Sequence, residues 1–297
     1  MPKSTKRPIS GWIILDKPYG MSSTQAVGKV RWLYSAEKAG HAGTLDPLAT
    51  GLLPIALGEA TKTVLFVQDG GKRYRFELLW GTQTSTDDAE GEAIATSDAR
   101  PTEAALRAML PRFTGTIMQR PPAFSAIKVN GERAYDLARA GETVELAERP
   151  VTIDELTLLS HTPERSLFEM ACEKGTYVRS LARDLALALG TVGHVSMLRR
   201  TEVAGFTEKD SILLEAIERS DSRDALLRPT AIALRHLPEL RLSGDDANLL
   251  RNGNPVLLRG AGAPIELPAA WASANGAAVA IGQVRGGHFH PSRVLRT

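Results

Sequence analysis

Apolar and charged side chains alternate along residues 72–80, and this period of two predicts a half-buried strand. One face of that strand carries four large apolar residues: Tyr74, Phe76, Leu78 and Trp80. Residues 176–189 instead carry apolar side chains three and four positions apart, which predicts a helix that ends at Gly190. The same spacing follows Ser22 and Ser23, so one of these serines is expected to cap another helix.

The remaining elements are predicted from shorter patterns. Strands are predicted over four further ranges: 11–15, 151–159, 166–172 and 195–203. Pro101 marks the first turn of a helix that Pro111 stops, whereas residues 40–58 and 82–92 are predicted to be loops. Because strands and helices interleave without a regular strand–helix–strand repeat, we expect an α+β fold with a mixed, mostly antiparallel central sheet and flanking helices.

Length and composition predict two domains. The 297 residues exceed what one small core needs. From Arg235 onward the chain has seven arginines, no lysine and four acidic residues, and glycines break its short apolar runs. We therefore expect a larger domain over residues 1–234 and a small β-rich domain over residues 235–297.

Composition also excludes several classes of protein. Hydrophobic residues make up 43% and charged residues 24%, which is typical of globular chains and argues against disorder. No apolar run approaches the roughly 18 residues of a membrane span, and the stretch from Trp12 to Leu15 is too short for a signal peptide. We expect a soluble cytoplasmic protein with no membrane partner. The single cysteine, Cys172, excludes an intramolecular disulfide and favours a buried structural thiol.

The distribution of charge is compatible with a polyanionic partner without requiring one. The formal net charge is only +2, but basic residues gather in residues 1–40, 111–139 and 172–200, and acidic residues gather in 87–90 and 210–224. Separate basic clusters suit a surface that follows phosphate groups, and they equally suit ordinary solvated faces.

The segment GHAGTLDPLATGLLPIALG, residues 40–58, contains a single acidic residue, Asp46. Pro47 restricts Asp46 to an extended backbone, and Gly43 and Gly51 allow close backbone approach. Apolar neighbours would place this carboxylate in a dry, preformed pocket suited to catalysis. Taken alone, however, the pattern favours a buried Asp-Pro turn whose carboxylate caps nearby amides.

This segment resembles the TruB family of tRNA pseudouridine synthases, together with KPYGMSS at residues 17–23 and KGTYVR at residues 174–179. The likeness continues through residues 119–131 and through HVSMLRR at residues 194–200, so it covers residues 10–205.

The resemblance implies a fold and a division of labour. Residues 1–234 would form the catalytic domain with the pseudouridine synthase fold, and an insert at about residues 112–141 would contact RNA. Residues 235–297 would form a PUA-like RNA-binding domain.

The resemblance also implies that the protein isomerises uridine to pseudouridine in the T-arm loop of tRNA, at the position conventionally numbered 55. The base would leave its stack, its N-glycosidic bond would break, and the uracil would rotate and rejoin through carbon. No redox step or net hydrolysis occurs, so we expect no cofactor, and the sequence has no P-loop or dinucleotide-binding motif. We expect a monomer whose partner is tRNA.

Three residues match the family's catalytic positions. Asp46 would be the essential carboxylate, acting as a nucleophile or by stabilising a ribosyl cation. Arg179 matches the arginine partner, whose charge would oppose the rise in the pKa of Asp46 that an apolar pocket causes. Tyr74 matches the tyrosine that stacks on the target base, although its strand face also suits plain core.

Four more residues match substrate-binding or RNA-binding positions: His41, Lys17, Leu198 and Tyr177. His41 matches the histidine that fills the gap left by the flipped base, Leu198 an apolar pocket wall, and Lys17 a structural or RNA-facing lysine. We expect no metal site, because two histidines near the C-terminus share a strand face without a third ligand: His288 and His290.

Two other functions remain open from the residues. A non-catalytic RNA-binding or tRNA-folding protein would use the basic insert and the C-terminal domain as a clamp, and it would not need Asp46. A nucleoside-cleaving hydrolase would break the same bond and release free uracil.

Overall fold

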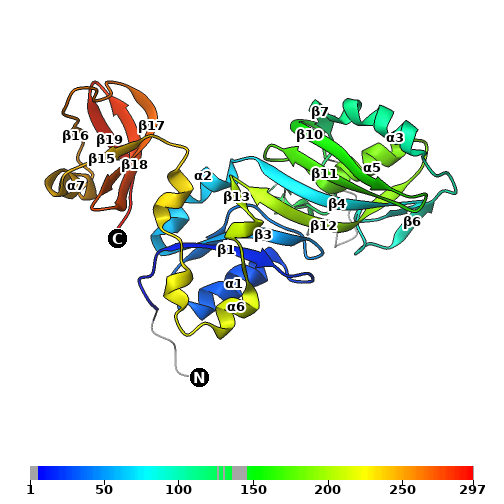
Figure 1. Cartoon of the computed structure of the whole chain (residues 1–297), viewed down its shortest axis with the longest axis horizontal. Coiled ribbons are helices and arrows are strands. Elements are labelled where there is room, and N and C mark those ends of the chain that lie inside the picture. Colours follow the sequence, from blue (N-terminus) through cyan, green and yellow to red (C-terminus); the bar gives the residue numbers. More distant parts are fainter. Residues whose placement is uncertain (1–5, 126, 130, 136–145, 297) are drawn as a thin grey trace.

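The computed structural model describes residues 6–125, 127–129, 131–135 and 146–296. Figure 1 shows a large sheet flanked by helices and a smaller sheet at the C-terminal end of the chain. Residues 126, 130 and 136–141 of the expected insert lie outside the described ranges. None of the described helices has both the length and the apolar character needed to cross a membrane.

The large sheet contains ten strands within the described residues, and its main path runs β14-β1-β3-β12-β4-β11-β10-β7. In chain order these strands are β1 (Gly11–Lys17), β2 (Ala39–His41), β3 (Thr50–Leu57), β4 (Lys72–Trp80), β7 (Gly115–Gln119), β10 (Arg149–His161), β11 (Arg165–Cys172), β12 (Gly193–Val203), β13 (Phe206–Thr207) and β14 (Ile212–Leu213). β2 pairs beside β3, and β13 beside β12. Of these pairs, β1–β14 and β3–β12 are parallel and the others antiparallel, which confirms the predicted mixed, mostly antiparallel sheet.

The described α-helices are α1 (Ser23–Leu33), α2 (Val64–Gln68), α3 (Glu103–Met109), α5 (Val178–Ala188), α6 (Leu214–Arg219) and α7 (Gly244–Arg251). Short 3-10 helices occupy Gly58–Thr63, Leu110–Phe113, Glu208–Asp210, Arg223–Leu226 and Thr230–Leu234. Ser22 caps α1 through a capping box with Gln25, which decides between the two serines that the sequence offered. The helix predicted to begin at Pro101 begins at Glu103 instead, because the Thr102 hydroxyl caps it.

The predicted loop over residues 40–58 is wrong at its start, where Gly40 and His41 belong to β2, and in its second half, which forms strand β3. β3 is buried at every position except its first, and it lies between β1 and β12. A strand that is covered on both faces shows no alternation of polar and apolar residues, so the sequence pattern did not reveal it. Residues 42–49 remain a loop between β2 and β3, and this loop carries Asp46.

The other predicted loop, residues 82–92, is wrong at its start. β5 (Thr82–Thr84) pairs there with β6 (Ala93–Thr96) in a small two-stranded sheet. Another two-stranded sheet joins β8 (Lys128–Val129) to β9 (Glu132–Arg133) within the insert.

The main core lies where α1 and α5 meet the large sheet. Phe76 of β4 stacks on Phe168 of β11 with ring centroids 5.1 Å apart, and Leu181 of α5 belongs to the same buried cluster. Leu45 and Leu48 also belong to this cluster, so the loop that carries Asp46 is anchored in the core on both sides of the carboxylate.

The small sheet has the strand order β15-β17-β18-β19-β16 and lies at the opposite end of the molecule from β7 and β10 (Figure 1). Its strands are β15 (Glu239–Arg241), β16 (Val256–Leu257), β17 (Leu267–Ala274), β18 (Ala277–Arg285) and β19 (His288–Val294). Leu250 of α7 and Phe289 of β19 belong to a separate core of this part of the chain. Lys62 joins the two parts, because its ammonium donates to the Val294 carbonyl at 2.7 Å.

Candidate active site

Asp46 lies at a point of the β2–β3 loop where the backbone is fixed on both sides. The Ser23 hydroxyl donates to the Leu45 carbonyl at 2.8 Å and accepts from the Leu45 N–H at 2.8 Å. The side chain of Asp46 nevertheless remains 32% exposed, so it faces an opening rather than the sealed core. The local pattern favoured a buried Asp-Pro turn. The turn is present, because the Ala49 N–H donates to the Asp46 carbonyl at 3.0 Å, but the carboxylate itself is only partly buried.

Arg179, in the first turn of α5, holds the Asp46 carboxylate. Its Nε lies 3.0 Å from Asp46 Oδ2, and its side chain is only 5% exposed. Both terminal nitrogens are held as well, because Nη1 donates to the Thr86 carbonyl at 3.0 Å and Nη2 to the Phe124 carbonyl at 2.9 Å. A guanidinium with this many fixed partners holds the carboxylate in one orientation.

Asp88 is a residue of this candidate site that the sequence reasoning missed. Its Oδ2 lies 3.5 Å from Arg179 Nη1, so Arg179 lies between two carboxylates. Asp88 Oδ1 also accepts from the Thr86 hydroxyl and from the Glu90 N–H, which shapes the loop around it. In the sequence Asp88 belongs to a short acidic run that is typical of a solvated loop, and no local signal distinguishes it.

Burial raises the pKa of Asp46 above its ordinary value, and the Arg179 charge acts in the opposite direction. The negative charge of Asp88 adds to the rise, whereas the charge of Lys17 reduces it. Asp46 is therefore a carboxylate whose ionised form depends on its neighbours, as is typical of catalytic groups.

Lys17 is fully buried at the end of β1. Its ammonium donates to the carbonyls of Pro18, Met21 and Pro47 at 2.9, 2.6 and 3.2 Å. Burial lowers the pKa of Lys17 to about 8. All three donors of the ammonium are thus used to hold the backbone beside Asp46, which fits the structural role expected of Lys17 and not the RNA-facing one.

Arg200, on β12, is a second residue that the sequence did not single out. It is only 1% exposed, and its guanidinium donates to the carbonyls of Leu52, Thr44 and Gly43 at 2.7, 3.4 and 3.1 Å. These carbonyls lie before and after Asp46 in the chain. One side chain therefore ties both ends of the loop that carries the carboxylate.

Tyr74 and Leu198 both lie in the main core, and each is less than 9% exposed. Tyr74 is opposite Arg200 in the β4–β12 register, and Leu198 is opposite Phe76. Burial raises the pKa of the Tyr74 hydroxyl, and Arg200 and Asp46 are close enough to influence it. Tyr74 is thus a core residue whose polar end approaches the Asp46 site, so the two roles considered for it are compatible.

His41 is the last residue of β2, and Asp46 lies in the loop that follows β2. Its Nδ1 is buried and has no hydrogen-bond partner among the described residues. Burial, followed by the positive charge of Arg200, lowers the pKa of the ring. At neutral pH the imidazole is therefore mainly uncharged, and its Nδ1 is enclosed by the protein.

Tyr177 is the N-cap residue of α5, two positions before Arg179 in the chain. Its backbone N–H and carbonyl both bond to the Gln119 side chain, at 2.8 and 3.1 Å. The Arg149 guanidinium lies 5.5 Å from the centre of the Tyr177 ring, within the range of a cation–π contact. Tyr177 thus fixes the start of the helix that carries Arg179 against the base of the insert.

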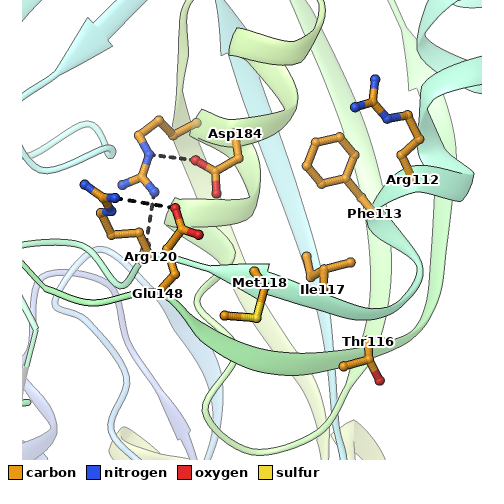
Figure 2. Close-up of a pocket in the computed structure, with 9 residues that line it drawn as sticks. Arg112, Phe113, Thr116, Ile117, Met118, Arg120, Glu148 and Asp184 are labelled. Carbon is orange, nitrogen blue, oxygen red and sulfur yellow. Dashed lines mark hydrogen bonds and ion pairs between the residues drawn. The ribbon is translucent and has the colours of Figure 1, made fainter.

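Other candidate groups do not form a site. No cluster of three or more potential metal ligands occurs in the described ranges, and the rings of His288 and His290 are 6.3 Å apart. Burial raises the pKa of the Cys172 thiol to about 11, so it stays protonated at neutral pH. A cavity of about 810 Å³ beside β7 and α5 lies away from Asp46 and is lined by residues such as Ile117, Arg120 and Asp184 (Figure 2).

The assembled groups suit chemistry at an electron-poor carbon. A carboxylate with one fixed guanidinium partner and an open side can add to such a carbon or stabilise a cation that forms there. The buried side chains of Tyr74 and Leu198, with the half-buried ring of His41, provide an apolar and aromatic environment for a planar ligand.

The sequence matches two family models. The N-terminal domain of the TruB family pseudouridylate synthases matches residues 31–178, and the tRNA pseudouridylate synthase B C-terminal domain matches residues 179–235. The chain is 55% identical over 305 residues to the tRNA pseudouridine synthase B of Rhizobium meliloti (strain 1021), with 99% of this chain and 98% of that protein covered. It is 56% identical over 304 residues to the protein of the same name from Agrobacterium fabrum, with 99% and 96% covered.

Solved structures share the fold. A Cbf5-Nop10-Gar1 complex contains a chain that aligns with a TM-score of 0.72 and 25% identity, covering all of this chain and 87% of that one. An H/ACA RNP bound to a substrate RNA containing 2'-deoxyuridine contains a chain that aligns with a TM-score of 0.74 and 24% identity, over 97% of this chain and 85% of that one.

Proposed function

The chain belongs to the TruB family of pseudouridylate synthases, and we propose that it converts uridine to pseudouridine at position 55 in the T-arm loop of tRNA, with Asp46 as the essential carboxylate. It is an isomerase that acts on tRNA, as the names of its relatives indicate. The reaction breaks the bond between C1′ of the ribose and N1 of uracil, rotates the base, and joins C1′ to C5, from which a proton leaves.

The contact between Asp46 and Arg179 carries the proposal. Arg179 Nε lies 3.0 Å from Asp46 Oδ2, and this charge favours the ionised form of a half-buried carboxylate whose pKa burial raises. An ionised Asp46 can add to C1′ or stabilise the ribosyl cation as the glycosidic bond breaks. Lys17 and Arg200 hold the loop so that the carboxylate keeps this position.

The neighbouring residues receive the flipped base. Extruding a uridine from its stack costs a few kcal/mol, which aromatic contacts and side chains that fill the vacated space can offset. We assign base stacking to Tyr74, the pocket wall to Leu198, and the space left by the base to His41. Tyr177 positions Arg179 beside the insert that would contact RNA.

The C-terminal sheet is assigned to RNA binding as a PUA-like domain over residues 235–297. Its basic residues are all arginines, which bind phosphate groups through paired N–H donors. We also propose that the active form is a monomer, in which Asp46, Arg179 and Asp88 of one chain form the site.

The test is a T-arm hairpin incubated with the wild-type protein and with Asp46→Asn, followed by sequencing that detects the modified position. We expect pseudouridine at position 55 with the wild type, none with Asp46→Asn, and nearly equal affinity of both proteins for the hairpin. Full modification by Asp46→Asn would refute the role of Asp46. Release of free uracil by the wild type would instead indicate a hydrolase.

A further inference from the structure

A hollow of about 500 Å³ lies between the turn at residues 18–21 and the start of α1. Its lining consists of Pro18, Tyr19, Gly20, Met21, Gln25 and Lys29. This volume is within the range of roughly 300–1,000 Å³ that small-ligand sites have. The residues assigned above to catalysis do not line it, so the hollow is separate from the site around Asp46.

An exposed aromatic ring forms one wall of the hollow. Tyr19 is 69% exposed, although a tyrosine gains stability when its ring is covered. Gly20 adopts φ +78°, a conformation that a type II turn requires at its third position, and this turn presents Tyr19 at its tip. The backbone thus holds the ring toward solvent.

Hydrogen bonds join this turn to the catalytic loop. The Gly20 N–H donates to the Pro47 carbonyl at 2.8 Å, and Lys17 bonds to both segments. From standard backbone dimensions, the Cα atoms of Tyr19 and Asp46 are at most about 11 Å apart. Stacked nucleotides rise by about 3.4 Å each, so the hollow lies within about three nucleotides of a uridine bound at Asp46.

Two polar side chains complete the hollow. The Gln25 amide oxygen accepts from the Ser22 N–H in the capping box, so the amide offers its N–H donors to a ligand. The Lys29 ammonium pairs with Glu218 at 2.6 Å, but this exposed ion pair uses only one of its three donors and contributes little stability. An aromatic face, an amide donor and a cation together match the base and the phosphate of one nucleotide.

We propose that this hollow binds an unpaired nucleotide of the tRNA substrate, within about three positions of the target uridine. Its base stacks on Tyr19, an acceptor on the base edge receives a hydrogen bond from Gln25, and its phosphate pairs with Lys29. The proposal rests on tRNA being the substrate, as proposed above. It makes Tyr19 a binding residue and not a catalytic one.

The test measures the affinity of the full-length protein for the T-arm hairpin and the steady-state rate. Tyr19→Ala is compared with Tyr19→Phe, which keeps the ring, and with Leu187→Ala. Leu187 is a matched control because it is also a large, mostly exposed side chain, at 53%, and it lies in the last turn of α5, away from the lining of the hollow. Loss of one stacked base predicts that Tyr19→Ala raises Kd by about 5- to 140-fold and that the loss appears in KM more than in kcat. Tyr19→Phe and Leu187→Ala should bind as the wild type does.

A scan with single abasic nucleotides then locates the partner of Tyr19. At one position near the target, the abasic change should weaken binding by the wild type and have little effect on binding by Tyr19→Ala, because the stacking contact is already lost. Unchanged affinity of Tyr19→Ala, equal weakening by Leu187→Ala, or a scan without such a position would each overturn the proposal. Absence of pseudouridine with the wild type would overturn the proposed function instead, since binding is measured separately.

Discussion

Asp46 and Asp88 share one guanidinium: Arg179 Nε lies 3.0 Å from Asp46 Oδ2, and its Nη1 lies 3.5 Å from Asp88 Oδ2. The two carboxylates have different exposure, because Asp46 faces an opening and Asp88 is buried. Asp88 therefore cannot reach a substrate from its position, but it fixes the arginine that orients Asp46. Its negative charge also raises the pKa of Asp46.

Asp88→Asn should change the pH dependence of the reaction. Removing this negative charge lowers the pKa of Asp46, so the acid limb of the saturating rate should move to lower pH. Loss of the second anchor of Arg179 should also lower the rate on the neutral plateau, by about 10²-fold if the carboxylate moves by about 1 Å. Single-turnover rates between pH 4 and 8 measure both effects.

Asp87→Asn is the matched control for this prediction. Asp87 is the adjacent buried carboxylate, but it pairs with Arg183 at 2.9 Å and is not among the main groups that shift the pKa of Asp46. Its substitution should leave the acid limb in place. An equal shift in both variants would show that the shift does not come from the specific charge of Asp88 beside Asp46.

Asp46→Asn should be more stable than the wild type at neutral pH. The pKa of Asp46 is raised in the folded state, so the folded protein binds this proton more tightly than the unfolded chain does. The resulting stabilisation is present below the ordinary carboxyl pKa of 3.8 and is lost as pH rises through the raised value. Asparagine resembles the protonated form and avoids this loss.

Urea unfolding of both proteins at several pH values between 4 and 8 measures this difference. The free energy of unfolding of Asp46→Asn should exceed that of the wild type at pH 7, and the gap should close toward pH 4. A less stable variant at pH 7 would mean that the ion pair with Arg179 outweighs the cost of burying the charge.

Gly51→Ala should destabilise the protein by about 2–6 kcal/mol, the combined cost of a strained backbone and an overpacked contact. Gly51 has φ +95°, and a Cβ there would lie 2.2 Å from the Arg200 carbonyl oxygen in the β3–β12 pair. Gly28→Ala is the matched control, because a Cβ at this position of α1 meets nothing within 4 Å. It should add about 0.5–1 kcal/mol of stability. Denaturant unfolding compares the two, and a mild effect at Gly51 would contradict the close contact.

Local patterns of apolar and polar residues were sufficient to predict those elements whose two faces differ in exposure to solvent. The strand predicted over residues 72–80 coincides with β4, and the predicted helix over residues 176–189 contains all of α5. β3 escaped prediction because both of its faces are covered, so its sequence lacks alternation. Asp46 and Arg179 were found from their motifs and not from spacing, since the local pattern alone favoured a structural turn.

The strand over residues 72–80, the helix over residues 176–189 and, through the motifs of the family resemblance, the candidate pair of Asp46 and Arg179 could be predicted from the sequence by itself. Only the tertiary structure decided that Asp88 and Arg200 belong to the same site, that Lys17 is enclosed by carbonyls, and that Tyr19 lies beside the catalytic loop. The physical reason is distance along the chain. Periodicity records which face of an element is buried, whereas Arg200 meets a carbonyl 148 positions away, and Arg179 meets Asp46 and Asp88 from a separate helix. Such contacts exist only once the sheet has brought these segments together.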